Sequence, residues 1–255
     1  MGHMAVGIID AVGKGVTSHT VGARVGYIGP NSYATFTNMA ANRLFSLPDA
    51  VTDDVAGGYL LRGLTAEYLL RRLYKVGPGT TALVHAAAGE WGRLLGARMI
   101  GTVSSEAKAE IARAHGYDAV INYASEDFVA RTLDETDGTG ADVIYDGVGK
   151  MAFLKSLDCV RPRGMVVSYG TASGNVGEFD LQRLHSKSII VTRPTLRSWI
   201  ADPDEAALAS QALFDVLSGG KIQTPLGAQF PLDQAAEAHR QLESRSVTAP
   251  IVLIP

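Results

Sequence analysis

The sequence contains a single cysteine, Cys159, in 255 residues, so no disulfide can form within the chain. This composition fits a reducing environment, and we expect a cytoplasmic protein. No apolar run reaches the ~18 residues that a membrane-spanning helix needs. No basic segment followed by an apolar core, the pattern of a signal peptide, stands at the start of the chain. The sequence therefore predicts a protein without a membrane partner.

The sequence also lacks an excess of charge of either sign. Lysine and arginine total 23 against 26 aspartate and glutamate, which gives a net charge of −3. No basic cluster could follow a nucleic-acid backbone, so we expect no nucleic-acid partner. The six histidines show no metal-ligand spacing such as H-E-x-x-H, and we expect no metal site.

What the chain does contain is enough apolar sequence for a sizeable core, since 46% of its residues are hydrophobic. Its length fits one large domain or two small ones. The first 50 residues have the character of strands and loops, and a helix is expected from Thr52 onward. The strands expected in this part are Ala5–Val12, Arg24–Ile28 and Tyr33–Asn38.

From residue 80 onward, apolar strands alternate with helices. Ser105 is the expected N-cap of one helix and Ser125 of the next, and Gly116 stands where a helix commonly ends. This alternation predicts an α/β fold with a doubly wound parallel sheet. The expected strands are 81–85, 97–103, 118–122, 143–146, 165–169 and 189–192.

The pattern Ala87-x-Gly89-x-x-Gly92 directly follows the first of these strands. Glycines at such a turn let the backbone approach a pyrophosphate, so the pattern favours a dinucleotide site, with a simple tight turn as the alternative. Two residues do not suit the site. Glu90 would place a carboxylate near the phosphates, and Trp91 would place an indole where a small side chain normally packs.

The second strand ends at Ser104 and Ser105, with Lys108 one turn later. A cofactor without a 2′-phosphate usually meets an acidic residue there. Hydroxyls and an ammonium group would instead suit the 2′-phosphate of NADP, although an N-cap serine and a solvated lysine explain these residues equally well. His85 lies in an apolar strand and is expected to be a satisfied core residue, and Cys159 an inert one.

Further motifs are spread over nearly the whole chain, at residues 84–89, 100–105, 120–123, 145–149, 156–159, 161–165, 192–195 and 242–255. Together these motifs resemble the NADPH-dependent quinone oxidoreductases of the zeta-crystallin type, which are zinc-independent medium-chain dehydrogenases.

The resemblance implies a Rossmann domain, a partial GroES-like β-rich catalytic domain, and a homodimer. We place the Rossmann domain at 53–195 and the catalytic domain at 1–52 and 196–255. The implied reaction is hydride transfer from NADPH to a quinone or a related conjugated carbonyl. The 2′-phosphate would meet Ser104, Lys108 and Tyr123. The other cofactor contacts that the resemblance implies are Gly89, Gly92, Gly147, Ser168, Tyr169, Gly170 and Arg245.

The chain departs from the family pattern in three places. About 60 N-terminal residues of the family pattern have no counterpart, the phosphate loop reads Gly89-Glu-Trp-Gly92, and the helix after it is about two turns short. All three departures affect expected cofactor or substrate contacts. The alternative to an active reductase is therefore a non-catalytic remnant that dimerises and binds nucleotide weakly or not at all. The segment Ser188–Val191 would then be a dimerising sheet edge or else a buried inner strand.

Overall fold

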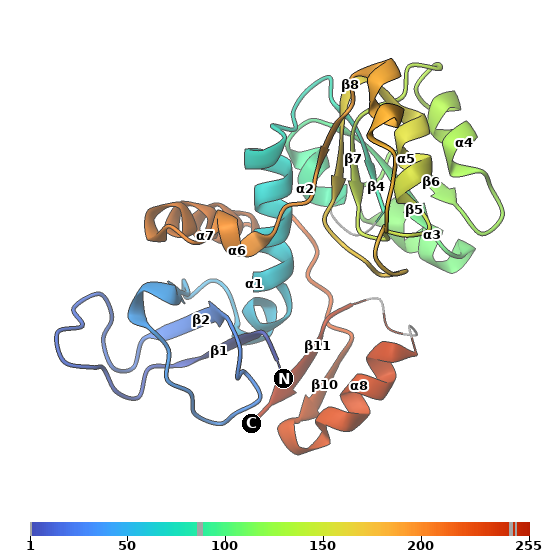
Figure 1. The fold of residues 1–255 in the computed structure, drawn as a ribbon. Coiled ribbons are helices and arrows are strands. Elements are labelled where there is room, and N and C mark those ends of the chain that lie inside the picture. Colours follow the sequence, from blue (N-terminus) through green and yellow to red (C-terminus); the bar gives the residue numbers. More distant parts are fainter. Residues whose placement is uncertain (1, 86–88, 245–246, 248) are drawn as a thin grey trace. The chain divides into compact units, whose positions relative to one another are not determined.

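The computed structural model describes residues 2–85, 89–244, 247 and 249–255. It divides into two compact units, which are described separately (Figure 1). One unit comprises Met1–Glu67 and Trp199–Pro255, and the other comprises Tyr68–Ser198.

A six-stranded sheet forms the centre of the unit Tyr68–Ser198, in the order β6-β5-β4-β7-β8-β9. Every pairing between these neighbours is parallel. The order reverses direction between β4 and β7, which is the defining feature of a doubly wound sheet. The predicted α/β class and parallel sheet are confirmed. The strands are β4 (Thr81–Val84), β5 (Arg98–Val103), β6 (Ala119–Asn122), β7 (Ala141–Asp146), β8 (Val160–Ser168) and β9 (Ile190–Thr192).

Helices cover both faces of this sheet. Since crossovers between parallel strands are right-handed, α2 and α3 lie on one face, and α4 and α5 lie on the other (Figure 1). The first segment of the unit, η2, is a π-helix that continues directly from the helix before it. The helical segments are η2 (Tyr68–Leu73), α2 (Gly89–Leu94), α3 (Glu106–Ala114), α4 (Phe128–Asp134), α5 (Phe153–Cys159), η3 (Leu181–Lys187) and α6 (Leu196–Trp199).

The core of this unit lies between the sheet and α4 and α5. Its large residues are at most 7% exposed, and burial of such side chains stabilises by about 1.5–3 kcal/mol each. Cys159 belongs to this core, and its burial raises its thiol pKa to about 12, as expected for an inert cysteine. The core includes Leu83, Ile100, Ile121, Phe128, Ile144, Phe153, Leu157 and Val166.

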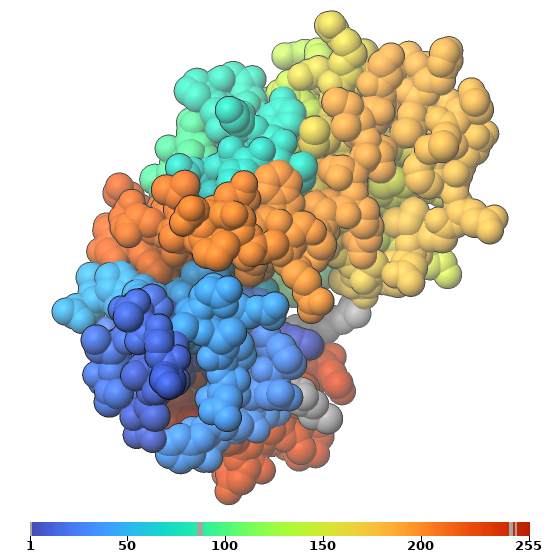
Figure 2. Space-filling model, turned by 60° about the vertical axis from the view of Figure 1, so that its left-hand side comes forward, coloured from blue at the N-terminus to red at the C-terminus, as the bar shows by residue number. Residues whose placement is uncertain are grey.

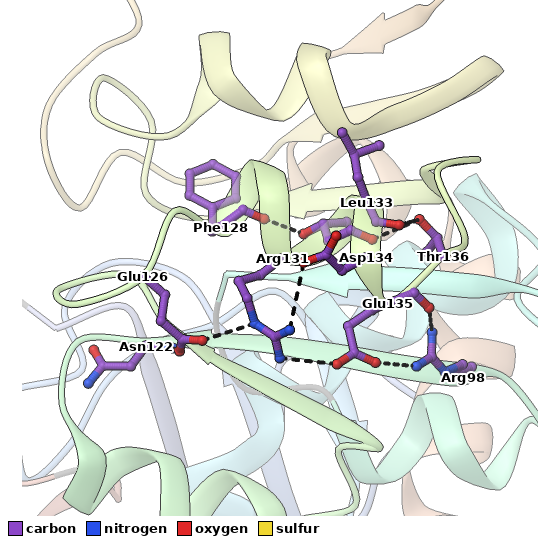
Figure 3. A network of polar contacts seen from close by, with 10 residues as sticks. Arg98, Asn122, Glu126, Phe128, Arg131, Leu133, Asp134, Glu135 and Thr136 are labelled. Carbon is purple, nitrogen blue, oxygen red and sulfur yellow. Dashed lines mark hydrogen bonds and ion pairs between the residues drawn. The ribbon is translucent and has the colours of Figure 1, made fainter.

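A polar network joins α4 to the sheet (Figure 3). Arg131 forms ion pairs with Glu126 at 3.0 Å and with Glu135 at 3.2 Å. Glu135 in turn pairs with Arg98, the first residue of β5, at 2.5 Å. Because these side chains are partly exposed, each pair contributes little alone, and the network mainly fixes how α4 meets β5.

The other unit contains two small sheets and three longer helices. Strands β1, β2 and β3 form an antiparallel sheet, and β10 and β11 pair in parallel. The elements are β1 (Met4–Ile8), β2 (Arg24–Ile28), η1 (Ala41–Arg43), β3 (Leu44–Ser46), α1 (Asp53–Glu67), α7 (Pro203–Ser218), β10 (Ala228–Pro231), η4 (Leu232–Gln234), α8 (Ala235–Glu243) and β11 (Ile251–Ile254).

Contacts distant in sequence hold this unit together. Helix α1 packs closely on α7 at Gly63, where an added Cβ would lie 2.3 Å from Leu213 Cδ1. The Tyr33 hydroxyl lies 3.0 Å from Nε2 of His239 in α8. The N-terminal and C-terminal segments of the unit, blue and red in Figure 2, are thereby joined.

Three details differ from the sequence-based prediction. Residues 33–36 form bends, and residues 37–38 have no regular secondary structure, so the predicted strand is absent there. The N-cap of α4 is Asp127, whose Oδ1 accepts a hydrogen bond from the Val129 N–H at 3.0 Å, whereas the Ser125 hydroxyl donates to the Asn122 carbonyl. Strand β1 ends at Ile8, four residues before the predicted end. In the part of the chain that the structure describes, no helix combines the length and apolar character needed to cross a bilayer.

Candidate nucleotide-binding site

The strand order identifies where a ligand would bind. In open α/β sheets, ligands bind beyond the carboxyl ends of the strands, at the point where the order reverses. Here that point lies between β4 and β7. The loops that follow β4, β5, β7 and β8 therefore define the candidate site, and all of them belong to the unit Tyr68–Ser198.

The glycines of the predicted phosphate loop are packed against protein. Helix α2 begins at Gly89, where an added Cβ would lie 2.6 Å from the Tyr117 ring. An added Cβ at Gly92 would lie 2.3 Å from the Met99 sulfur. Both glycines thus allow α2 to approach β5 and its neighbours closely. Ala86 to Ala88, the first part of the predicted loop, lie outside the described residues.

The two residues that do not suit a phosphate loop have other places in the structure. Trp91 is buried, at 5% exposure. Glu90 directs its Oε1 toward the His115 ring, at 3.0 Å from Nδ1. The Glu90 carboxylate therefore engages the residue that ends α3, while its backbone stays in the first turn of α2.

The residues predicted at the 2′-phosphate lie together at the carboxyl ends of β5 and β6. Lys108 Nζ donates a hydrogen bond to Ser104 Oγ at 3.3 Å. Ser105 caps α3, as predicted, by accepting from the Lys108 N–H. The backbone N–H of Tyr123 donates to the Val103 carbonyl at 3.0 Å, and its side chain is 43% exposed. The Ser104 hydroxyl and the Lys108 ammonium group thus lie side by side, and the backbone of Tyr123 lies at the end of the neighbouring strand.

The predicted residues on β7 and β8 form a second group. The loops after these strands approach so closely that an added Cβ at Gly170 would lie 2.4 Å from the Gly147 carbonyl oxygen. The Tyr169 side chain reaches across toward β7, where its hydroxyl would lie 3.0 Å from a Cβ at Gly147. Burial raises the pKa of Tyr169, so this phenol stays protonated. Ser168 is buried beside them.

Two residues of this region were not predicted, Asp146 and Arg193. Asp146 is fully buried, and its Oδ1 accepts from the N–H groups of Val148 and Gly149 at 2.7 and 2.9 Å. Its Oδ2 has no hydrogen-bond partner among the described residues. Burial raises the pKa of Asp146, while those two N–H groups and the Arg193 charge lower it.

Arg193 follows β9 and is anchored at the end of β8. Its Nη1 donates to the Ser168 carbonyl at 2.6 Å and lies 3.4 Å from both Ser168 Oγ and the Gly170 carbonyl. Burial raises the pKa of Tyr68 to about 12, and the Arg193 charge has a smaller effect that lowers this pKa. The signal that could have identified Arg193 is its position immediately after a strand of the predicted parallel sheet.

His85, directly after β4, is the satisfied core histidine that was expected. It is 6% exposed, its Nδ1 lies 2.6 Å from Thr102 Oγ1, and its Nε2 lies 3.2 Å from Ser156 Oγ. Its ring meets Phe128 edge to face, with centroids 5.0 Å apart. Burial lowers the pKa of His85 to about 4, so the ring is neutral near pH 7.

The structure does not test two predictions about the site. Arg245, expected on the nicotinamide side, lies outside the described residues. The residues that the structure describes contain no group of three or more His, Cys, Asp or Glu arranged to bind a metal. Zinc independence remains a prediction.

Comparisons with known proteins agree with this geometry. Residues 85–212 match the family model described as "Zinc-binding dehydrogenase". The quinone oxidoreductase of Pseudomonas aeruginosa is 42% identical over 265 aligned residues, which cover this whole chain and 82% of that protein. The 2-haloacrylate reductase of a Burkholderia species is 41% identical and also covers the whole chain, with 80% of its own length aligned.

Solved structures give the same relationship. The crystal structure of Escherichia coli quinone oxidoreductase complexed with NADPH superposes with a TM-score of 0.96 at 38% identity. The match covers all of this chain and 82% of that one. Identity of 42% over the whole of this chain and 82% of the Pseudomonas aeruginosa protein shows that the chain belongs to the quinone oxidoreductases of the medium-chain dehydrogenase/reductase family.

Proposed function

We propose that the protein is an NADPH-dependent oxidoreductase that transfers hydride to a quinone or a related conjugated carbonyl. The observation that carries the proposal is the Ser104–Lys108 pair at the carboxyl end of β5, in which Lys108 Nζ donates a hydrogen bond to Ser104 Oγ at 3.3 Å. An acidic residue at this place would bind the free 2′-hydroxyl of NAD, whereas these groups suit a phosphate. The relative complexed with NADPH supports the same cofactor.

The residues present fit the 2′-phosphate of this cofactor. Lys108 supplies the positive charge, Ser104 a hydroxyl donor, and Tyr123 a partly exposed phenol. The nicotinamide end would pass the closely packed loops of Gly147 and Gly170, with Ser168, Tyr169 and Arg245 beside it. When bound, NADPH supplies the hydride, and the protein supplies position and electrostatics.

Arg193 is the group that we propose acts on the acceptor. Hydride addition to a conjugated carbonyl leaves negative charge on the carbonyl oxygen, and a fixed cation nearby stabilises that charge. Arg193 is held in place by its Nη1 bonds to the β8 loop, and the side chain remains exposed. The name of the 2-haloacrylate reductase indicates that its substrate is a conjugated acid. The carboxylate of such a substrate would also be a suitable partner for the Arg193 cation.

The alternative of a non-catalytic remnant receives less support. The relatives that cover the whole chain carry the names of reductases. The awkward residues of the α2 region, Glu90 and Trp91, have ordinary structural explanations in a folded unit. A non-catalytic remnant would not require a Ser104–Lys108 pair at the carboxyl end of β5, so this pair favours an enzyme.

The domain and subunit assignments are part of the proposal. We propose that 53–195 binds the cofactor and that 1–52 with 196–255 contributes the acceptor side, and the compact unit Tyr68–Ser198 overlaps the first of these. We also propose a homodimer through the edge strand β9, where Ile190 is 51% exposed. An exposed apolar edge strand is a ready template for a second copy.

The test has two steps. The protein is first titrated with NADPH while the fluorescence of the cofactor is monitored, and NADPH oxidation is then measured with a simple quinone. The proposal predicts saturable binding and quinone-dependent turnover. Binding without oxidation by any quinone or conjugated carbonyl would refute the activity, and absence of binding at millimolar NADPH would refute the cofactor.

A further inference from the structure

We propose that Asp146, the last residue of β7, is a positioning residue that holds the Arg193 side chain in the orientation in which it acts on the acceptor. The inference rests on the proposed function and extends it to a buried residue that does not itself touch the acceptor. Three observations support it: the place of Asp146 between two loops, the state of its second carboxylate oxygen, and the neutral partners of Arg193.

Asp146 lies where the loops after β7 and β8 meet. It pairs in the parallel sheet with Ser168, the last residue of β8. Its backbone carbonyl accepts hydrogen bonds from the N–H groups of Tyr169 at 2.9 Å and Gly170 at 3.2 Å. Arg193 Nη1 donates to the Ser168 carbonyl and lies 3.4 Å from the Gly170 carbonyl. Asp146 and Arg193 thus hold the same short segment of the β8 loop through different backbone atoms.

The side chain of Asp146 holds the β7 loop. Its Oδ1 accepts from the N–H groups of Val148 and Gly149 at 2.7 and 2.9 Å. Gly149 has a φ of +84°, and an added Cβ there would lie 2.5 Å from the Gly174 carbonyl oxygen, so this turn fits tightly against the β8 loop. The amide oxygen of an asparagine could accept from the same two N–H groups. The shape of the turn therefore explains Oδ1 but does not explain why the group is charged.

The second carboxylate oxygen indicates that the charge has a use. Asp146 is fully buried, and its Oδ2 has no hydrogen-bond partner among the described residues. Burial of a carboxylate costs free energy unless an opposite charge compensates for it. Burial raises the pKa of Asp146, and the two N–H groups and the Arg193 charge lower it. The carboxylate and the guanidinium are thus close enough to interact electrostatically.

Arg193 needs such a partner, because its Nη1 contacts are with neutral oxygens of the β8 loop. Two phenols also belong to this group, since Tyr68 interacts with Arg193 and Tyr169 with Asp146. Burial raises the pKa of both phenols, so they stay neutral near pH 7 and Asp146 supplies the negative charge. A long side chain loses conformational entropy when it is held, and a fixed opposite charge favours the held orientation. Such a fixed cation stabilises charge in a transition state without having to reorient.

The test is a double-mutant cycle of Asp146→Asn and Arg193→Met, measured as kcat/KM for a quinone. Asparagine keeps an oxygen for the two N–H groups of the β7 loop and removes the charge. We expect Asp146→Asn to lower kcat/KM about fivefold or more, with the NADPH dissociation constant within about twofold. In the Arg193→Met protein, the same substitution should change kcat/KM less than about twofold, because no cation remains to be positioned.

Asp202→Asn is the matched control. Asp202 Oδ1 also accepts from two backbone N–H groups, those of Asp204 at 2.9 Å and Glu205 at 3.0 Å, but it caps α7 in the other compact unit. Asparagine caps helices about as well as aspartate, so this variant should keep both kcat/KM and the Arg193 coupling. Urea unfolding shows whether each variant is folded. If Asp146→Asn does not fold, Asp146→Ser takes its place, because a hydroxyl can accept from the same N–H groups.

A second measurement does not need turnover. The ¹⁵N relaxation of the Arg193 Nε–H signal, identified by its loss in Arg193→Met, reports how ordered this side chain is on the picosecond to nanosecond timescale. We expect the signal of an ordered group in the wild type, greater mobility in Asp146→Asn, and no change in Asp202→Asn. If the wild type shows no quinone turnover, the proposed function fails, and this measurement still decides the inference.

Three results would overturn the inference. Additive losses in the cycle would show that Asp146 acts on the loops and not through Arg193. Unchanged kcat/KM together with unchanged Arg193 mobility in a folded Asp146→Asn protein would show that the charge is not used. An Arg193 side chain that is already mobile in the wild type would show that nothing holds it in one orientation.

Discussion

Acidification tests the buried environment of His85. The Ser156 hydroxyl donates to the Ala152 carbonyl at 3.0 Å, so it accepts from His85 Nε2–H. Nδ1 is then unprotonated and accepts from the Thr102 hydroxyl at 2.6 Å. Protonation of Nδ1 would force the Thr102 hydroxyl to change from donor to acceptor and would place a charge in the core.

The size of the effect follows from the two pKa values. Burial lowers the pKa of His85 from 6.5 to about 4 in the folded protein. Between these values the unfolded chain binds a proton that the folded protein does not, so stability falls as the pH falls. Each pKa unit corresponds to about 1.4 kcal/mol, so the free energy of unfolding should drop by about 3 kcal/mol from pH 7 to pH 4.

The assay is urea unfolding at a series of pH values, for the wild-type protein and for His85→Gln. The variant has no group that titrates at this position, so the difference in the pH dependence of the two proteins isolates His85. An NMR titration of the His85 ring measures the same pKa independently of the variant's stability. Equal pH dependence of the two proteins, or a His85 pKa near 6.5, would refute the account of the buried ring.

Three substitutions test other parts of the account. Arg193→Met should lower kcat/KM for a quinone by about 10-fold or more, while the NADPH dissociation constant stays within about threefold; an equal loss in cofactor affinity would assign Arg193 to the cofactor instead. Gly170→Ala should destabilise the fold by about 1–3 kcal/mol in urea unfolding, because its Cβ would meet the Gly147 backbone, whereas Gly7→Ala, with nothing within 4 Å, should not. Asp127→Ala should cost about 1 kcal/mol through loss of the α4 cap, and Ser125→Ala clearly less; the reverse order would contradict the cap that the structure shows.

Much of the unit Tyr68–Ser198 could be predicted from the sequence, because its signals are local. Apolar runs bounded by glycine or polar residues became the strands of the parallel sheet, and Ser105 and Gly116 mark the ends of α3 as expected. The alternation of strands with helices along the chain then predicted that the sheet is parallel. The edge position of β9 was one of two alternatives for Ser188–Val191, and strand order decided between them.

Other features depend on tertiary contacts that a local pattern does not contain. The segment Tyr33–Asn38 is rich in residues that favour strands, yet Phe36 is 79% exposed and Tyr33 contacts His239 far along the chain. Ser125 and Asp127 are both good capping residues, and only the backbone conformation selects Asp127.

The candidate site shows the same limit. Ser104 and Lys108 are one helical turn apart, so the sequence could place them together. Arg193 and Ser168 are 25 positions apart, and they meet only because β8 and β9 are neighbours in the sheet. The packing of Gly89 and Gly92 on Tyr117 and Met99 likewise follows from how α2 meets β5.

The most direct test of hydride transfer is a single-turnover experiment with NADPH bound to the protein and a quinone added in one mixing step. The account predicts that bound NADPH is oxidised and that deuterium at its transferable C4 position slows this oxidation. Tight NADPH binding with no quinone-dependent oxidation, or an oxidation rate insensitive to that deuterium under conditions where chemistry limits the rate, would contradict it.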